Sequence, residues 1–191
     1  MNGIQAITLG ASAGGVSALL NLFHALPLDF RIPLVCVLHL PDDRHSQLAE
    51  VFSRRLGRPV TEARDKQEVA PGMIYFAGPG YHLSVERDRS FSLSQEERVY
   101  FSRPSIDILF ASAADAYGPA LLGVLLTGAN EDGAHGLAQI KQSGGYTIVQ
   151  DPREAQVATM PNAALALHHP DYILPLHGIG QLLAKLEFTE C

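Results

Sequence analysis

Short apolar runs alternate along the chain with longer segments in which apolar residues recur at helical spacing. The apolar runs span residues 4–9, 34–38, 121–126 and 146–149. Runs this short, apolar on both faces, are typical of buried parallel strands. The segments with helical spacing are 16–26, 46–56, 105–116, 136–142 and 179–186. A strand followed by a helix, repeated, predicts an α/β fold: a doubly wound, mainly parallel sheet with helices on both faces.

Residues 60–94 depart from this alternation. Gly72 and the Gly78-Pro79-Gly80 turn separate short alternating segments at 73–77 and 82–85. We interpret these segments as an inserted β-hairpin region attached to the main sheet. Since no internal repeat and no linker interrupts the chain, we expect a single domain over residues 1–191.

The composition favours a globular domain and argues against a membrane-spanning or nucleic-acid-binding protein. Of the 191 residues, 47% are hydrophobic and 18% are charged, as in globular domains. No apolar run approaches the roughly 20 residues that a membrane span requires. The formal net charge of −6 disfavours nucleic acid as a partner, because such binders concentrate Lys and Arg on one face.

The cysteines and histidines indicate neither a disulfide framework nor a metal site. The two cysteines are Cys36, within an apolar run, and Cys191, the last residue. Without a signal-peptide pattern at the start, this usage predicts a reducing, cytoplasmic setting. His168 and His169 are adjacent, and no Cys or His group has the spacing of a zinc site, so we expect no metal and no other cofactor.

A serine, a histidine and an aspartate each follow a predicted strand. Ser12 lies in a glycine-rich turn, His39 directly follows the run 34–38, and Asp132 lies in the loop after residue 126. The carboxyl ends of parallel strands share one edge of the sheet, where active sites gather. Taken singly, each has a structural explanation: a helix cap or phosphate-binding turn for Ser12, a structural histidine, and an aspartate in a turn or N-cap.

Together, these residue types favour hydrolytic chemistry. A serine hydroxyl becomes a strong nucleophile when a histidine takes its proton and an acid orients the imidazole. We expect the His39 Nε2 atom near the Ser12 Oγ atom, with Asp132 on the other ring nitrogen; Asp151, after the run 146–149, is the competing acid. A sharp turn at Ser12 would aim the Ala13 N–H at a developing oxyanion. The order Ser, His, Asp is not that of α/β-hydrolases.

Several longer motifs share an order along the chain. They are Gly10-Ala11-Ser12-Ala13-Gly14-Gly15, Val37-Leu38-His39-Leu40-Pro41, Arg103-Pro104-Ser105-Ile106-Asp107, Leu126-Thr127-Gly128 with Asp132-Gly133-Ala134, and Gln150-Asp151-Pro152 with Met160-Pro161. In this order they resemble the methylesterase domain of the chemotaxis protein-glutamate methylesterase family (the CheB family), from residue 7 to about residue 183. Each motif alone is weak, but five in the right order are specific.

The resemblance implies a cytoplasmic enzyme of signal transduction. The family hydrolyses γ-glutamyl methyl esters on receptor proteins, and often deamidates glutamine there. By position, Ser12 is implied as nucleophile, His39 as general base and acid, and Asp132 as the orienting acid, whereas Asp151 matches no triad position. The implied partner is a methylated chemoreceptor-like protein, with no nucleic acid and no membrane insertion. The family's receiver domain has no counterpart in this chain, so we expect a separate regulatory partner or constitutive activity.

The sequence also departs from the family pattern around the site. Ala13 replaces the usual Thr, and Ala129-Asn130 replaces Met-Gly in the aspartate loop. With Gly14, these residues form the predicted oxyanion and substrate loops. We expect Asn130 to adopt the positive φ of the missing glycine and Ala129 to open the substrate groove. Three functions follow: a receptor methylesterase, a triad esterase or amidase on another substrate, and a catalytically degenerate receptor-binding module.

Overall fold

A parallel sheet forms the centre of the computed structural model, which describes residues 3–39 and 47–186. Its strands are β1 (Ala6–Ala11), β2 (Leu34–Leu38), β3 (Val60–Glu62), β4 (Ile74–Phe76), β7 (Leu121–Leu125), β8 (Tyr146–Gln150) and β9 (Tyr172–Leu174). They lie in the order β3-β4-β2-β1-β7-β8-β9, and each pairing is parallel. The predicted α/β class, with a mainly parallel sheet, is confirmed.

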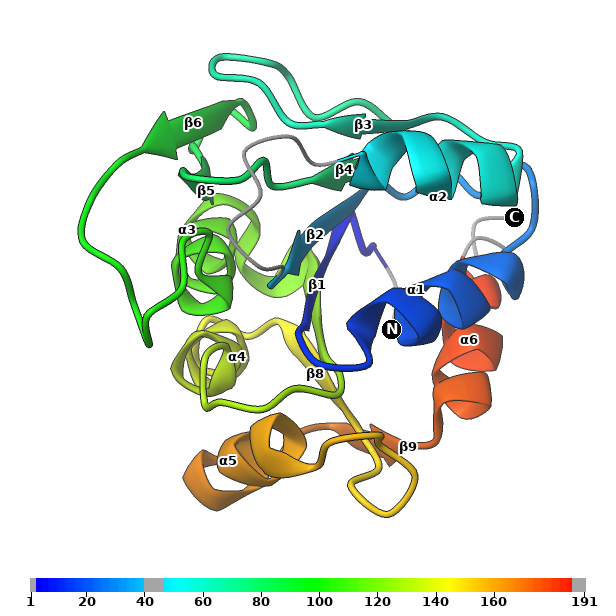
Figure 1. Ribbon diagram of the computed structural model, residues 1–191, viewed down its shortest axis with the longest axis vertical. Coiled ribbons are helices and arrows are strands. Elements are labelled where there is room, and N and C mark those ends of the chain that lie inside the picture. The colour runs from blue at the N-terminus through cyan, green and yellow to red at the C-terminus, as the bar shows by residue number, and fades with distance from the viewer. Residues whose placement is uncertain (1–2, 40–46, 187–191) are drawn as a thin grey trace.

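Helices cover both faces of the sheet (Figure 1). One face carries α1 (Gly15–His24), α2 (Leu48–Leu56) and α6 (Leu176–Ala184), and the other carries α3 (Ile106–Tyr117), α4 (Ala134–Gln142) and α5 (Thr159–Leu167). A short 3₁₀ turn, η1 (Gly118–Ala120), leads into β7. Among the helices that the structure describes, none has the length and the hydropathy of a membrane-spanning segment.

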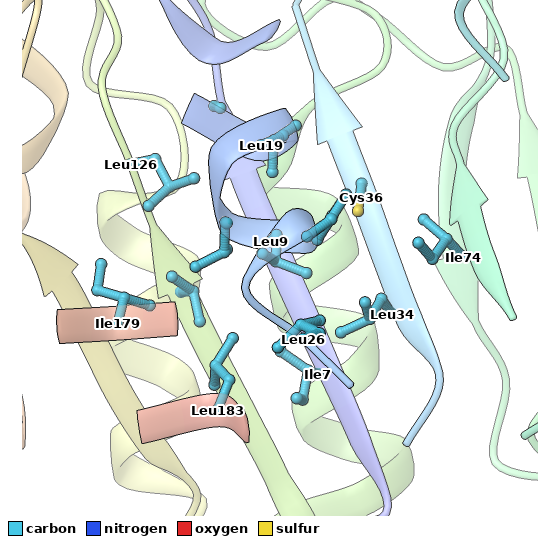
Figure 2. Packing of buried hydrophobic residues seen from close by; sticks show 14 of the residues in the cluster. Ile7, Leu9, Leu19, Leu26, Leu34, Cys36, Ile74, Leu126, Ile179 and Leu183 are labelled. Atoms are coloured by element: carbon cyan, nitrogen blue, oxygen red, sulfur yellow. The ribbon is translucent and has the colours of Figure 1, made fainter. Parts of the chain in front are cut away.

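The strands alternate their side chains between two hydrophobic cores. In β1, Ile7 and Leu9 pack with the α1 and α6 side, whereas Ala6 packs with α3 and α4. Figure 2 shows Leu19 of α1 and Leu183 of α6 converging on Ile7 and Leu9. This burial on both faces explains why the predicted strands are continuous apolar runs.

The region 60–94 divides into two parts, which corrects one prediction. The segment 73–77 is not a hairpin: its core, β4, pairs in parallel with β2 and β3, inside the main sheet. Ile74 and Phe76 face one core and Tyr75 the other, so both sides of this strand are buried. The hairpin prediction is confirmed for the segment 82–85, because β5 (His82–Val85) pairs antiparallel with β6 (Phe91–Ser94) as a separate two-stranded sheet.

Strand register brings the predicted site residues to one edge. Ala11 of β1 pairs with Leu38 of β2, and Gly10 pairs with Leu125 of β7. Chain order reverses around β1, since β2 lies on one side and β7 on the other. The loops that follow these three strands therefore flank the crevice in which open α/β sheets bind ligands.

Candidate active site

Ser12 directly follows β1 in a turn where its main chain, and not its side chain, forms the hydrogen bonds. Its backbone N–H donates to the Thr127 carbonyl (2.9 Å), and its carbonyl accepts from the Gly15 N–H (2.7 Å). Gly14, at φ 81°, is the N-cap of α1, with no side-chain cap hydrogen bond. The helix-cap alternative for Ser12 is therefore wrong. Its Oγ atom forms no hydrogen bond with any residue that the structure describes, which leaves the hydroxyl available to a substrate.

His39 directly follows β2, the strand that pairs with β1, and its imidazole contacts Asp132. The His39 N–H donates to the Ala11 carbonyl (3.0 Å), and the Nε2 atom is 2.8 Å from Asp132 Oδ2. The expected assignment of the ring nitrogens is wrong. Nε2 is the nitrogen farther from the main chain, and it meets a carboxylate that is fixed on the first turn of α3. Since Nε2–H donates to the carboxylate, Nδ1 carries the lone pair.

Asp132 is fully buried, and its two carboxylate oxygens accept four hydrogen bonds. The donors are His39 Nε2, the N–H groups of Ile106 (2.7 Å) and Asp107 (3.0 Å), and the Ser105 hydroxyl (2.8 Å). Burial raises the pKa of the Asp132 carboxyl, but these hydrogen bonds outweigh burial and hold the pKa below its usual value. The positive end of the α3 dipole acts in the same direction. Asp132 is therefore an oriented, ionised partner for His39.

Two residues that support Asp132 were missed as site residues. Ser105 is the N-cap of α3 and also accepts from the Ile108 N–H (3.4 Å), so one hydroxyl serves both helix and carboxylate. The sequence signal for it was the helix start predicted at residue 105. Buried His82 of β5 accepts from the Ser105 N–H (3.1 Å) at Nδ1, while its Nε2 contacts the Glu97 carbonyl (2.9 Å). The inserted hairpin thus holds Ser105 in position, and Ser105 in turn donates to the Asp132 carboxylate.

Asp107 is a second buried carboxyl near Asp132. Its Oδ1 atom accepts from the Gly136 N–H (2.7 Å) at the start of α4. Burial, reinforced by the negative charge of Asp132, raises the pKa of Asp107. The two carboxyls therefore have opposite shifts in pKa, and Asp132 is the one held as an anion beside the imidazole.

Backbone hydrogen bonds orient two N–H groups that could stabilise an oxyanion. The Ser12 carbonyl is turned toward Gly15, so the trans peptide directs the Ala13 N–H the opposite way. The Gly128 carbonyl accepts from the Met160 N–H (3.0 Å), which turns the Ala129 N–H away from α5. Within the described residues, neither N–H has an acceptor, as an oxyanion hole requires.

Thr127 joins the serine loop to the segment before α5. Its hydroxyl donates to the Ala13 carbonyl (2.8 Å) and accepts from the Val157 N–H (2.9 Å). Its own N–H donates to the buried Gln150 side chain (2.9 Å). The threonine therefore holds the Ala13–Gly14 peptide at a fixed distance from β7.

The two substituted positions of the aspartate loop differ in role. Ala129 is exposed, and the opening of the substrate groove at this position stays a prediction. The expectation for Asn130 is wrong, because it does not adopt a positive φ. Its side-chain oxygen instead accepts from the Asp132 N–H (3.2 Å), which closes the turn without a glycine.

Two further polar residues, both missed from the sequence, lie close to the site. The Ser102 Oγ atom is 3.4 Å from His39 Nδ1. Gln156 lies against Gly14: a Cβ atom added there would be 2.5 Å from Gln156 Oε1. Both residues precede helices as parts of long loops, where no periodic pattern indicates which side chains turn inward.

Asp151, the competing acid, pairs with an arginine and not with His39. Asp151 pairs with Arg153 (2.6 Å), whose hydrogen bonds lower the pKa of that carboxyl to about 2, and it makes no contact with His39. Among residues 3–39 and 47–186, no group of three or more His, Cys, Asp or Glu could hold a metal ion.

Comparison with known proteins identifies the family that this chain resembles over most of its length. A family model described as CheB methylesterase matches residues 7–183. A Leptospira interrogans protein named putative protein-glutamate methylesterase/protein-glutamine glutaminase is 44% identical over 183 residues, covering 96% of this chain and 95% of that protein. A Methanospirillum hungatei relative, named protein-glutamate methylesterase/protein-glutamine glutaminase 2, is 39% identical, but the match covers 52% of its length.

A solved structure agrees with the fold. The crystal structure of the Thermotoga maritima CheB methylesterase catalytic domain matches with a TM-score of 0.89 and 31% sequence identity. The match covers 96% of this chain and 98% of that one. The similarity therefore extends over nearly the whole of both chains.

Proposed function

The chain belongs to the CheB methylesterase family, and we propose that it hydrolyses γ-methyl esters of protein glutamate residues through Ser12, His39 and Asp132. The observation that carries this proposal is the 2.8 Å contact between His39 Nε2 and the buried Asp132, at the edge of the sheet where Ser12 follows β1. We further propose that residues 1–191 act as a single domain in the cytoplasm, on a methylated chemoreceptor-like protein, with no cofactor.

In the first half of the reaction, Ser12 Oγ attacks the ester carbonyl carbon while its proton passes to His39 Nδ1. The oxyanion accepts hydrogen bonds from the N–H groups of Ala13 and Ala129, contacts worth about 3 kcal/mol each in comparable sites. The C–O bond to the methoxy group then breaks. The imidazolium returns the proton to the leaving oxygen, so methanol departs and a glutamyl ester of Ser12 remains.

In the second half, His39 Nδ1 takes a proton from a water molecule that attacks the glutamyl ester. The second tetrahedral intermediate uses the same donors, and its collapse returns the proton to Ser12 Oγ and releases the glutamate carboxylate. Asp132 stays ionised throughout and stabilises the imidazolium. With a glutamine side chain, the same steps release ammonia, which makes glutaminase activity the natural second reaction.

The decisive experiment compares two serines near the same imidazole. We expect Ser12→Ala to reduce methanol release from a methylated receptor by at least about 10³-fold. Ser102→Ala, the matched control 3.4 Å from Nδ1, should retain at least roughly a tenth of the activity, because hydroxyls at that distance bond weakly. Equal release by wild type and Ser12→Ala would contradict the proposal.

The exposed Ala129 favours a second candidate function, the hydrolysis of a different ester or amide by the same residues. A panel of model esters assayed beside the methylated receptor separates the two, because turnover of the receptor alone excludes the second. A degenerate binding module would show neither activity. Regulation by a separate partner would appear as a change in turnover when candidate regulators are added.

A further inference from the structure

A tight turn in the loop before α3 carries two aromatic residues in a backbone conformation that such side chains rarely adopt. Tyr100 and Phe101 have φ angles of 47° and 62°. The N–H groups of Val99 and Ser102 each donate to the carbonyl of the other residue (3.1 and 2.8 Å). Two-residue turns with positive φ at both central positions favour Asn and Gly, and a bulky side chain there is strained. Residues 99–102 are called the aromatic turn below.

Hydrogen bonds on both sides hold the aromatic turn in place. The Arg98 guanidinium donates to the Phe101 carbonyl (3.2 Å). On the other side, the Arg103 guanidinium donates to the carbonyls of Gln95 (3.0 Å) and Glu96 (2.9 Å). Figure 1 shows the long loop between β6 and α3 that these bonds close at its base. The turn is therefore preorganised, so binding a partner costs little conformational entropy.

The aromatic turn lies against the reacting groups. The Ser102 Oγ atom is 3.4 Å from His39 Nδ1, the atom that takes the proton of the nucleophile. Since neighbouring Cα atoms are 3.8 Å apart, the Phe101 Cα atom is within about 10 Å of that nitrogen. Burial raises the pKa of the Tyr100 phenol, and so do the negative charges of carboxylates at the start of α3 and in the aspartate loop. The turn thus borders both the imidazole and the aspartate loop.

Phe101 is strained without burial to offset the strain. Its side chain is 94% exposed, the highest value among the large hydrophobic residues that the structure describes. A glycine at this position would adopt the same φ without strain. Strained residues that the fold does not need cluster at active sites and ligand-binding sites. The stabilising contact of this ring is therefore expected from a bound molecule.

We propose that Phe101 binds an apolar side chain of the substrate protein, one that flanks the methylated glutamate. A polypeptide whose ester carbonyl lies between Ser12 and His39 must pass the aromatic turn, because Ser102 contacts the imidazole. An extended chain rises about 3.3 Å per residue, so a side chain within about three positions of the ester reaches the ring. Burial of the ring against an apolar group is favourable. This inference rests on the proposed function of Ser12.

The test uses synthetic peptides that carry one glutamate γ-methyl ester and a single leucine at one of the three positions on either side. Matched peptides have serine in place of the leucine. Methanol release is measured for wild type, Phe101→Ala, Phe101→Tyr and the control Leu28→Ala. Leu28 is also exposed (82%), but it precedes β2, at the opposite end of that strand from His39. N-acetylglutamate γ-methyl ester N-methylamide, which has no flanking side chains, is the small substrate.

The expected result is a preference of wild type for at least one leucine peptide over its serine counterpart. We expect about a tenfold difference in kcat/KM, arising from KM. Phe101→Ala should abolish this preference, Phe101→Tyr should keep most of it, and Leu28→Ala should leave it unchanged. Turnover of the small ester should be the same in all four proteins, because none of these side chains touches the reacting atoms.

A glycine variant separates substrate binding from folding. Phe101→Gly removes the ring and the strain together. We expect its melting temperature to be at least that of wild type, while the leucine preference disappears as it does in Phe101→Ala. A lower melting temperature would show that the ring stabilises the fold, and would overturn the inference.

The remaining outcomes separate this inference from the proposed function. Turnover without any leucine preference in wild type, or a preference that survives Phe101→Ala, would overturn the role of Phe101 alone. An equal loss on the peptides and the small ester would also overturn it, since the ring would then act on catalysis or folding. So would a dimer in sedimentation that Phe101→Ala dissociates without a change in leucine preference, which assigns the ring to a second copy of the chain. No turnover of any substrate by wild type would contradict the proposed function, and this inference with it.

Discussion

At the scale of single residues, Asp132 is the side chain on which the proposed role of His39 depends most. Asp132→Asn keeps the size of the group but places an amide among four donors. The amide cannot favour the same ring tautomer of His39 or stabilise an imidazolium. We expect kcat to fall by about 10³- to 10⁴-fold, with KM changed little. Steady-state methanol release measures both constants; a loss confined to KM would indicate a role in binding instead.

The pH dependence of stability provides a second test of Asp132. Because its pKa is lower in the folded protein than in the unfolded chain, its contribution is complete above the unfolded pKa and is lost as pH falls through the folded pKa. We expect Asp132→Asn to reduce the free energy of unfolding by about 2 kcal/mol between about pH 5 and 8. That difference should shrink below about pH 4. Denaturant titrations across this range measure it, and a difference independent of pH would contradict the assignment.

The chain pattern predicted that Ser12, His39 and Asp132 lie at one edge of the sheet, but it did not predict which atoms of His39 and Asp132 are in contact. Ser12, His39 and Asp132 each follow an apolar run, and parallel strands bring such positions to one edge. Which ring nitrogen of His39 contacts Asp132 depends on where α3 begins relative to His39. That distance is set by the packing of the folded chain, so the sequence pattern does not give it. Ser102 and Gln156 reach the site from irregular loops, where no period relates sequence position to direction.

At the scale of elements, the contact between α3 and α4 supports the carboxylate. A Cβ atom on Gly136 of α4 would lie 2.6 Å from the Phe110 Cβ atom and 2.9 Å from the Asp107 carbonyl oxygen. The backbone of α3 cannot yield without moving the N–H groups that bind Asp132. We expect Gly136→Ala to lower the free energy of unfolding by about 1–3 kcal/mol and to reduce kcat. Thermal unfolding and methanol release measure the two effects.

Gly178 of α6 is the matched control, another glycine inside a helix. There the added Cβ atom would be 3.5 Å from Pro175, an ordinary contact. We expect Gly178→Ala to raise stability by about 0.5–1 kcal/mol through helix propensity, with activity unchanged. Similar behaviour of the two variants would show that the α3–α4 contact has more freedom than the structure indicates.

Elements in which apolar residues recur at a regular spacing were predictable from the sequence, and elements without such a spacing were not. The run 34–38 coincides with β2, and the predicted helix 105–116 differs from α3 by one residue at each end. By contrast, β3 is half-buried at the sheet edge and has no apolar run. No helix was predicted for residues 159–167, where α5 forms with Pro161 in its first turn, a position at which proline is tolerated. The start of the predicted helix 46–56 lies outside the described residues.

At the scale of the whole molecule, Cys36 tests whether the strands at the centre of the sheet open without global unfolding, because it is packed in the core between the sheet and α1. Cys36 is fully buried in β2, and burial raises the pKa of its thiol well above the usual value. In a Cys191→Ser background, we expect Cys36 to react with a disulfide reagent only at the rate of global unfolding. Reaction faster than unfolding measured by circular dichroism would indicate local opening of β2.

Peptide mass spectrometry of the serine that a fluorophosphonate modifies tests whether Ser12 is the nucleophile. We expect stoichiometric labelling of Ser12, abolished in Ser12→Ala, slowed at least about 10³-fold in His39→Ala and preserved in Ser102→Ala. Labelling of Ser102 in the wild-type protein, or of no serine at all, would contradict this expectation.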